Sequence, residues 1–203
     1  MALDLLLALA GFAFVSSITP GPNNMMLLAS GVNHGFWRSV PHMLGVGCGF
    51  VAMVLIVGLG LGQLIIGNPQ LHLTLKVVSV IYLLWLAWKI ANSGPIATGS
   101  ESDTGTPMTF LQAALFQWVN PKAWAMALTA VAAYTQPANY MQSLLIVGFV
   151  FGLINIPSIA TWTGFGVALK QLLRDPVHVR MFNITMAVLL IASVIPALFE
   201  RTA

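Results

Sequence analysis

Long apolar runs alternate with short polar connections along the whole chain. A helix needs about 20 apolar residues to cross the roughly 30 Å hydrocarbon core of a bilayer. Six runs are of about this length, at about Leu5–Ser30, His42–Ile66, Leu71–Ala91, Phe110–Tyr134, Met141–Leu169 and Met181–Phe199. The pattern therefore predicts an all-α membrane protein with six transmembrane helices.

The longest polar segment, Asn92–Thr106, is rich in Gly, Ser, Thr and Pro and is typical of a flexible linker. It divides a single transmembrane domain (1–203) into repeat one (1–91) and repeat two (108–203), with a linker at 92–107. Each half has three predicted spans, so the second half enters the membrane from the opposite side. Similar halves would then form two inverted three-helix repeats.

Composition supports a location inside the membrane. The chain is 58% hydrophobic and only 6% charged, whereas a soluble domain has about 25% charged residues. The few Lys and Arg residues are dispersed and form no basic patch, which argues against nucleic-acid binding. Cys48 is the only cysteine, so the chain has no thiol pair for a thiol-electron carrier.

The positive charges predict an orientation. Most of them lie in or beside the connections that follow the first, third and fifth predicted spans: Arg38, Lys89, Lys170, Arg174 and Arg180. The positive-inside rule therefore places these connections in the cytoplasm and both termini outside. Lys76 and Arg201 are exceptions to this distribution.

Two predicted spans are interrupted. The first contains Thr19-Pro20-Gly21-Pro22-Asn23-Asn24, and the fourth contains Trp118-Val119-Asn120-Pro121-Lys122. Proline removes a backbone donor and its ring clashes with the preceding turn, so a regular helix cannot pass unchanged. Approached from opposite faces, both breaks lie near the bilayer middle. Paired interruptions of this kind indicate a transport site; a pair of packing kinks is the alternative.

The residues at the breaks suit an amino-acid zwitterion. Amide side chains and freed backbone groups offer acceptors for an ammonium group and donors for a carboxylate. The predicted substrate-binding residues are Pro20, Gly21, Pro22, Asn23, Asn24, Asn120, Pro121 and Lys122. For the asparagines, hydrogen bonding between helices is the alternative role.

Lys122 and His42 are the candidates for proton coupling. Lys122 is the only ionisable group predicted near the membrane centre, where a charged lysine costs about 2.5–3.5 kcal/mol and needs a cavity or a partner. Its alternative role is to extend toward the cytoplasmic interface. His42 lies near a predicted span boundary, as do His34, His72 and His178. A histidine at such a position is usually solvated at the membrane interface. No Asp or Glu lies in a predicted span centre, so the carrier of a coupled proton is unassigned.

Two further patterns concern the helices themselves. Asn155-Ile156-Pro157-Ser158 in the fifth predicted span indicates a third break, which either lines the same cavity or only kinks the helix. Gly45 and Gly49 favour a close approach of two helices.

Several of these motifs resemble those of the LysE/RhtB family of amino-acid exporters. Thr19-Pro20-Gly21-Pro22-Asn23-Asn24 resembles the first-span signature of the family, and Asn120-Pro121-Lys122 its fourth-span motif. His34-Gly35-Phe36 and Tyr82–Lys89 fit as well, so the resemblance covers the whole length. Within the family, the chain looks most like the cysteine and O-acetylserine exporter branch. Phe50 stands where many members have an Asp.

The resemblance implies a secondary transporter rather than an enzyme. It implies export of cysteine, O-acetylserine or other small neutral amino acids across the cytoplasmic (inner) membrane of a bacterium, by proton antiport with alternating access. The expected partners are the substrate, membrane lipid and, as a candidate, a second copy of the chain; no nucleic acid, cofactor or metal is expected. The alternative is a divalent-cation exporter on a related fold, which needs carboxylate, histidine or thiolate ligands in its spans.

Overall fold

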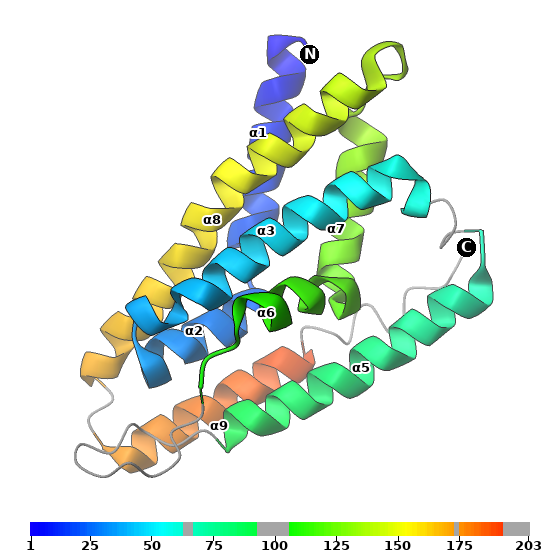
Figure 1. Cartoon of the computed structure of the whole chain (residues 1–203). Helices are drawn as coiled ribbons and strands as arrows, with labels where there is room; N and C mark the ends of the chain where they lie inside the picture. Colours follow the sequence, from blue (N-terminus) through cyan, green and yellow to red (C-terminus); the bar gives the residue numbers. More distant parts are fainter. Residues whose placement is uncertain (63–66, 93–105, 173–174, 193–203) are drawn as a thin grey trace.

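The computed structural model describes residues 1–62, 67–92, 106–172 and 175–192, and this part of the chain contains helices but no strand (Figure 1). The longer helices are α1 (Leu3–Ile18), α2 (Pro22–His34), α3 (Val40–Ile56), α5 (Pro69–Ala91), α6 (Phe110–Phe116), α7 (Pro121–Tyr134), α8 (Tyr140–Leu172) and α9 (Pro176–Ala192). Short helical turns flank them: η1 (Trp37–Ser39), η2 (Val57–Leu61), η3 (Gln117–Val119) and η4 (Pro137–Asn139). The predicted all-α fold class is confirmed.

Three helical segments of the described chain are long and apolar enough to cross a membrane: Trp37–Leu61, Leu73–Ala91 and Pro137–Lys170. The pair α1 and α2 makes a fourth if it is counted as one span, bent by 54°. Two further apolar helices, Phe110–Val119 and Val177–Ala192, are shorter. The arrangement of six spans in two repeats therefore stays a prediction. Residues 93–105 of the linker, Arg174, Arg201 and the ends of the second and sixth predicted spans lie outside the described residues.

The helices break where the prolines predict. α1 ends at Ile18 and α2 begins at Pro22, with Gly21 between them in an extended conformation. α7 begins at Pro121 after Asn120, whose side-chain oxygen accepts a hydrogen bond from the Lys122 backbone N–H at 3.1 Å. Proline suits the first position of a helix because the N–H that it lacks has no partner there. Each break therefore ends one helix and starts the next.

Pro157 does not end its helix, and whether it kinks the helix stays a prediction. α8 continues through Pro157 without interruption. A single proline removes one backbone hydrogen bond, whereas Pro20 and Pro22 together remove two within three residues and have a glycine between them. The helix tolerates the smaller loss.

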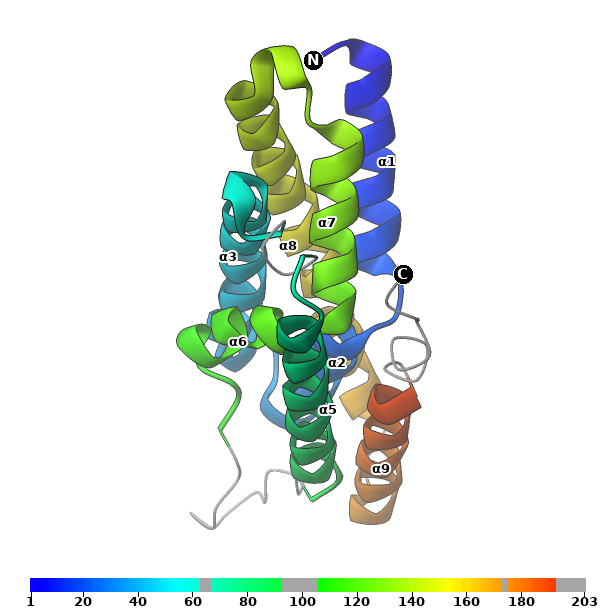
Figure 2. The ribbon, with the colours of Figure 1, turned by 90° about the vertical axis from the view of Figure 1, so that its right-hand side faces the viewer.

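The elements are arranged around the long helix α8. α1 and α2 pack along α8, and α3 packs against both α6 and α8. α5 and α9 lie side by side, away from the end of the molecule where the N-terminus, α1 and α7 lie (Figures 1 and 2). The two breaks, between α1 and α2 and before α7, therefore come near the middle of the molecule.

Glycines allow two of these contacts. A Cβ at Gly45 or Gly49 of α3 would clash with the backbone of α6, at the Phe110 carbonyl and at Ala114 respectively. The close helix approach predicted at these glycines is confirmed. α2 and α8 approach as closely, because a Cβ at Gly31 would meet the Thr163 carbonyl oxygen and one at Gly166 would meet the Leu28 carbonyl oxygen.

Large apolar side chains cover much of the outer surface. Trp37 is 83% exposed, Phe149 is 71% exposed and Trp88 is 65% exposed. Soluble monomers rarely expose apolar surface on this scale, so these side chains suit contact with lipid.

Candidate functional site

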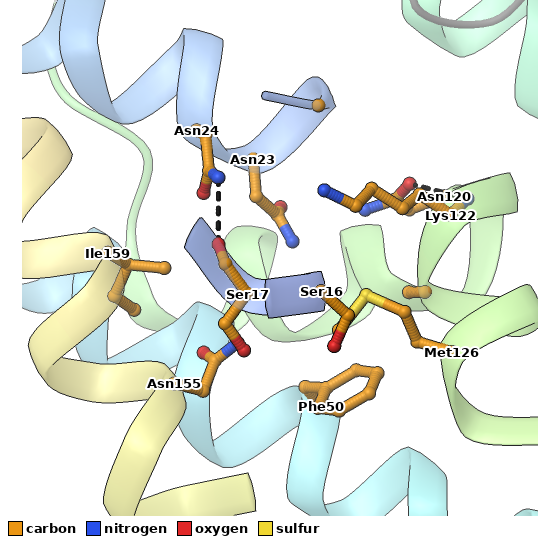
Figure 3. Close-up of a pocket in the computed structure, with 12 residues that line it drawn as sticks. Ser16, Ser17, Asn23, Asn24, Phe50, Asn120, Lys122, Met126, Asn155 and Ile159 are labelled. Carbon is orange, nitrogen blue, oxygen red and sulfur yellow. Dashed lines mark hydrogen bonds between the residues drawn. The ribbon is translucent and has the colours of Figure 1, made fainter. Parts of the chain in front are cut away.

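The two breaks meet at one pocket in the middle of the molecule (Figure 3). α1, α2, α3, α7 and α8 all contribute to its wall. Its polar lining consists of Ser16, Ser17, Asn23, Asn24, Asn120, Lys122 and Asn155. Its remaining lining consists of Gly21, Phe50, Ala123, Met126 and Ile159. The empty space among them amounts to about 330 Å³, including the part that is open to the surface.

Lys122 connects the two breaks. Its Nζ donates hydrogen bonds to the carbonyl oxygens of Thr19 at 2.6 Å and of Pro20 at 3.4 Å. These carbonyls directly follow the C-terminal end of α1, where the helix dipole favours a positive charge. The lysine therefore has its hydrogen-bond partners in the freed backbone of the other half of the chain.

The Lys122 side chain runs over Gly21. A Cβ at position 21 would lie 2.6 Å from Cδ of Lys122 and 3.1 Å from its Nζ. The backbone of Gly21 is extended, so other residues could adopt its conformation. The glycine is thus required for the close approach of Lys122 and not for a special backbone angle.

The other carbonyls at the end of α1 also have side-chain donors. Asn24 Nδ2 donates to the carbonyls of Ser17 at 2.9 Å and Thr19 at 2.8 Å. Trp162 of α8 donates its indole N–H to the Ile18 carbonyl at 3.0 Å. A helix end buried in a membrane protein needs such partners, because no solvent replaces the lost helical hydrogen bonds.

Asn23 and Gln117 form a reciprocal amide pair across the breaks. Asn23 Nδ2 donates to Gln117 Oε1 at 2.9 Å, and Gln117 Nε2 donates back to Asn23 Oδ1 at 3.3 Å. Gln117 is fully buried and also donates to the Ala113 carbonyl at 2.8 Å. The sequence analysis missed Gln117, although a glutamine inside an apolar run, three residues before Asn120, was a visible signal.

Asn155 presents a buried acceptor that has no partner among the described residues. Its Nδ2 donates to Ser17 Oγ at 3.1 Å, whereas its Oδ1 is buried without a hydrogen bond. The residue is 5% exposed and lines the pocket. Because a buried polar atom rarely lacks a partner, this oxygen is suited to accept a hydrogen bond from a ligand.

The polar groups of the pocket are of the kinds that suit the two ends of a small zwitterion. Asn155 Oδ1 is an acceptor suited to an ammonium group. The first turns of α2 and α7 carry N–H groups that have no partner within their own helix, and together with Lys122 they suit a carboxylate. No group of three His, Cys, Asp or Glu residues gathers in the described part of the chain.

The structure brings together most of the predicted site residues. Five of them line the pocket: Gly21, Asn23, Asn24, Asn120 and Lys122. Pro20, Pro22 and Pro121 shape the breaks instead. Asn155 also lines the pocket, in agreement with one of the two interpretations of the Asn155–Ser158 motif. The remaining lining residues were not predicted: Ser16, Ser17, Phe50, Ala123, Met126 and Ile159.

His42 lies in a different pocket. It is 2% exposed, so the solvated role expected at a span boundary is wrong. The sequence of α3 alone does not show which other elements cover the start of this helix. His42 lines a second pocket together with residues of α2 and α5.

Comparisons with known proteins agree with the resemblance found in the motifs. A family model described as LysE type translocator matches residues 14–196. The cysteine/O-acetylserine efflux protein of Escherichia coli O157:H7 is 31% identical over 193 residues, which cover 94% of this chain and 96% of that protein. The proteins of the same name from Escherichia coli K12 and Shigella sonnei Ss046 are 30% identical with the same coverage. No solved structure gives a significant match.

Proposed function

The chain belongs to the LysE type translocator family, and from this membership we propose that it exports cysteine, O-acetylserine or similar small neutral amino acids. It is a transport protein rather than an enzyme, and its family and apolar helices make it a protein of a bacterial inner membrane. The observation that carries the proposed substrate class is the pocket in which Lys122 and the buried oxygen of Asn155 meet.

The substrate binds in this pocket with its two charged ends apart. Its carboxylate takes the place of the Thr19 and Pro20 carbonyls as the partner of Lys122, since a hydrogen bond between two charged groups is stronger than one to a neutral carbonyl. Its ammonium group donates to Asn155 Oδ1. Pro20, Gly21, Pro22, Asn23, Asn24, Asn120 and Pro121 hold the two breaks in the shape that allows this.

Alternating access follows from the same contact. Six spans in two inverted repeats are proposed, with α1–α2 and α6–α7 as the broken spans and α5 and α9 as the third and sixth. The hydrogen bonds from Lys122 to Thr19 and Pro20 tie α7 to the end of α1. When the substrate carboxylate binds Lys122, these hydrogen bonds break, and the two halves of the chain can then move relative to each other. Membrane lipid surrounds the exposed apolar faces.

The export is proposed to be proton antiport, with Lys122 and His42 as the carriers. Lys122 changes partner when substrate binds or leaves, which gives it two environments in one cycle. His42 lies at the start of α3, between the central pocket and the end of the molecule that the proposed orientation places in the cytoplasm. A proton that moves inward would use both.

Efflux from proteoliposomes tests the function. Vesicles that contain the purified protein are preloaded with labelled cysteine, O-acetylserine, leucine or lysine, and loss is measured with and without an inward proton gradient. We expect faster loss of cysteine and O-acetylserine, and a further increase with the gradient. Accelerated loss of a divalent cation without loss of any amino acid would reverse the choice in favour of the cation exporter.

The orientation has a test of its own. A reporter of location fused after Ala203 is expected to report the outside of the membrane. A second reporter inserted within 93–105 is the matched control and is expected to report the cytoplasm. A cytoplasmic signal from the first would overturn the proposed orientation without affecting the export assay.

A further inference from the structure

A second pocket lies at the far end of α2, away from the breaks. α2, α3 and α5 line it together with residues 106–108. Its polar lining consists of Ser30, Asn33, His34, His42, Lys89 and Thr106. In the proposed orientation this pocket lies toward the cytoplasm, on the side from which an exported substrate arrives. The proposed binding of substrate in the central pocket does not use it, although the proposed proton transfer uses His42.

His42 is the least satisfied polar side chain at this pocket. Its ring is 2% exposed, and neither Nδ1 nor Nε2 has a hydrogen-bond partner among the described residues. Nδ1 of His34 is buried without a partner in the same way. Since leaving a buried donor or acceptor unpaired is costly, these nitrogens indicate that a ligand or water completes the pocket.

The charges around the pocket select an anion. Lys89 contributes to the wall, with its ammonium 4.9 Å from the centroid of the Trp85 ring. Arg38 and Lys170 lie close enough to His34 for their charges to act on its ring. No Asp or Glu is among the described residues that line the pocket. A carboxylate would find both positive charge and N–H donors here, whereas no described acidic side chain lines the pocket to pair with a cation.

One face of α2 joins this pocket to the central one. Asn23, Met26, Ser30 and Asn33 follow one another at the spacing of a helical face. Asn23 lines the central pocket, and the other three line the second pocket. Met26 is buried and packs in a cluster with Phe116. An amino acid that passed between the pockets along this face would meet the Asn23–Gln117 pair and this apolar cluster.

We propose that the second pocket is an anion site that binds the carboxylate of the amino acid before it enters the central pocket, with the His42 imidazole as a hydrogen-bond donor. The site would accept any small carboxylate, because its hydrogen-bond donors contact only the acid group of the ligand. This inference rests on the proposed export function, because that function supplies the amino acid as the ligand. The binding itself is measured without transport.

Histidine signals report the binding directly. Purified protein with ¹⁵N-labelled histidine is titrated at constant pH with 3-mercaptopropionate, which has a carboxylate but no amine, and with cysteamine, which has an amine but no carboxylate. We expect the signals of His42 and His34 to shift with the first probe only, while that of the exposed His178 stays in place. The proposal would be overturned if the His42 signal did not shift with 3-mercaptopropionate, or if it shifted equally with cysteamine.

Transport kinetics give a second readout. His42→Phe keeps a ring but removes both nitrogens, and we expect it to raise KM for cysteine about ten- to a hundredfold, as the loss of a hydrogen bond to a charged group implies. Because His42 is also a proposed proton carrier, the affinity and not the rate is the readout of the anion site. His42→Gln keeps an N–H donor and should restore most of the affinity. His178→Phe is the matched control and should leave KM unchanged. An unchanged KM in His42→Phe would contradict an initial binding site.

Lys122→Met separates the inference from the proposed function. This variant should lose export and yet keep the shift of His42 with 3-mercaptopropionate, because Lys122 does not line the second pocket. If wild-type protein exports no amino acid but the His42 signal still shifts, the export function fails and the anion site stands. If export is normal and the His42 signal stays in place, only the anion site fails.

Discussion

The ammonium nitrogen of Lys122 lies 2.6 Å from the main-chain carbonyl oxygen of Thr19, although 103 positions separate the two residues in sequence. Thr19 belongs to the break between α1 and α2, and Lys122 lies in the first turn of α7, directly after the second break. One break thus supplies carbonyls that have lost their helical donors, and the other supplies the charge that satisfies them. A substrate carboxylate would compete for the same lysine, which makes this contact the centre of the proposed cycle.

Gly21→Ala tests the space that Lys122 needs. The new Cβ would lie 2.6 Å from Lys122 Cδ, so the lysine must leave the Thr19 and Pro20 carbonyls. We expect the variant to fold and to export about tenfold more slowly, in line with the loss of a charged hydrogen bond.

Gly11→Ala is the matched control for this change. A Cβ at Gly11 meets nothing within 4 Å, and alanine within a helix is favoured over glycine by about 0.5–1 kcal/mol. Normal export by both alanine variants would show that the position of Lys122 over Gly21 does not matter for transport.

Asn155→Ala removes the buried acceptor that we assign to the ammonium group. The expected result is a rise of about tenfold or more in KM for cysteine, since one hydrogen bond to a charged group is lost. Asn155→Asp keeps an oxygen acceptor and should bind cysteine better than the alanine variant.

Ser158→Ala serves as the control on the same helix, because the Ser158 hydroxyl donates only to the Ile154 carbonyl of α8 and lies outside the pocket. Equal kinetic effects of Asn155→Ala and Ser158→Ala would point to a general effect on α8 rather than to ligand binding.

Sequence reasoning located the breaks because their cause is local. Pro20, Pro22 and Pro121 act on the turn that contains them, and each disfavours a regular helix through that turn. α8 continues through Pro157, where one missing hydrogen bond is tolerated inside a long packed helix. Pro22 and Pro121 stand at the first position of a helix, whereas Pro157 lies inside one.

The partners across helices could not be predicted in the same way. Gln117 meets Asn23 from 94 positions away, and Asn155 meets Ser17 from 138 positions away. Such pairs depend on which helix faces which, and polar residues inside apolar runs only indicate that some partner exists. The burial of His42 has the same origin, because a residue at a helix start is covered or solvated according to its neighbours.

The contact between α2 and α8 predicts a stability effect. A Cβ at Gly166 would meet the Leu28 carbonyl oxygen and the backbone of Gly31, and neither can move without shifting the helix. We expect Gly166→Ala to lower the free energy of unfolding by about 1–3 kcal/mol, as overpacking does, and to lower the thermal unfolding temperature in detergent.

Gly164→Ala is the control two residues away, since nothing lies within 4 Å of a Cβ there. It should leave stability unchanged or raise it slightly. An equal loss in both variants would mean that glycine is needed along this part of α8 for another reason.

A double-mutant cycle tests the Asn23–Gln117 pair. The single changes Asn23→Ala and Gln117→Ala each leave one amide without its partner, so the double variant should be more stable than additivity implies. The expected coupling is about 0.6–1.7 kcal/mol, the range of hydrogen bonds between membrane helices. Asn23→Ala combined with Ser158→Ala, which shares no hydrogen bond with it, should be additive; additivity in both cycles would contradict the pair.

The most direct measurement of the central claim is cysteine efflux by Lys122→Met in proteoliposomes. Methionine keeps the length of the side chain but removes the charge, so the carboxylate of the substrate loses its proposed partner. Arg180→Met, which removes an exposed positive charge outside the pocket, is the matched control. The account predicts that Lys122→Met inserts into the membrane normally and loses export at least a hundredfold, while Arg180→Met exports normally, in keeping with a contribution of about 3 kcal/mol from a hydrogen bond to a charged group. Export by Lys122→Met at the wild-type rate would contradict it.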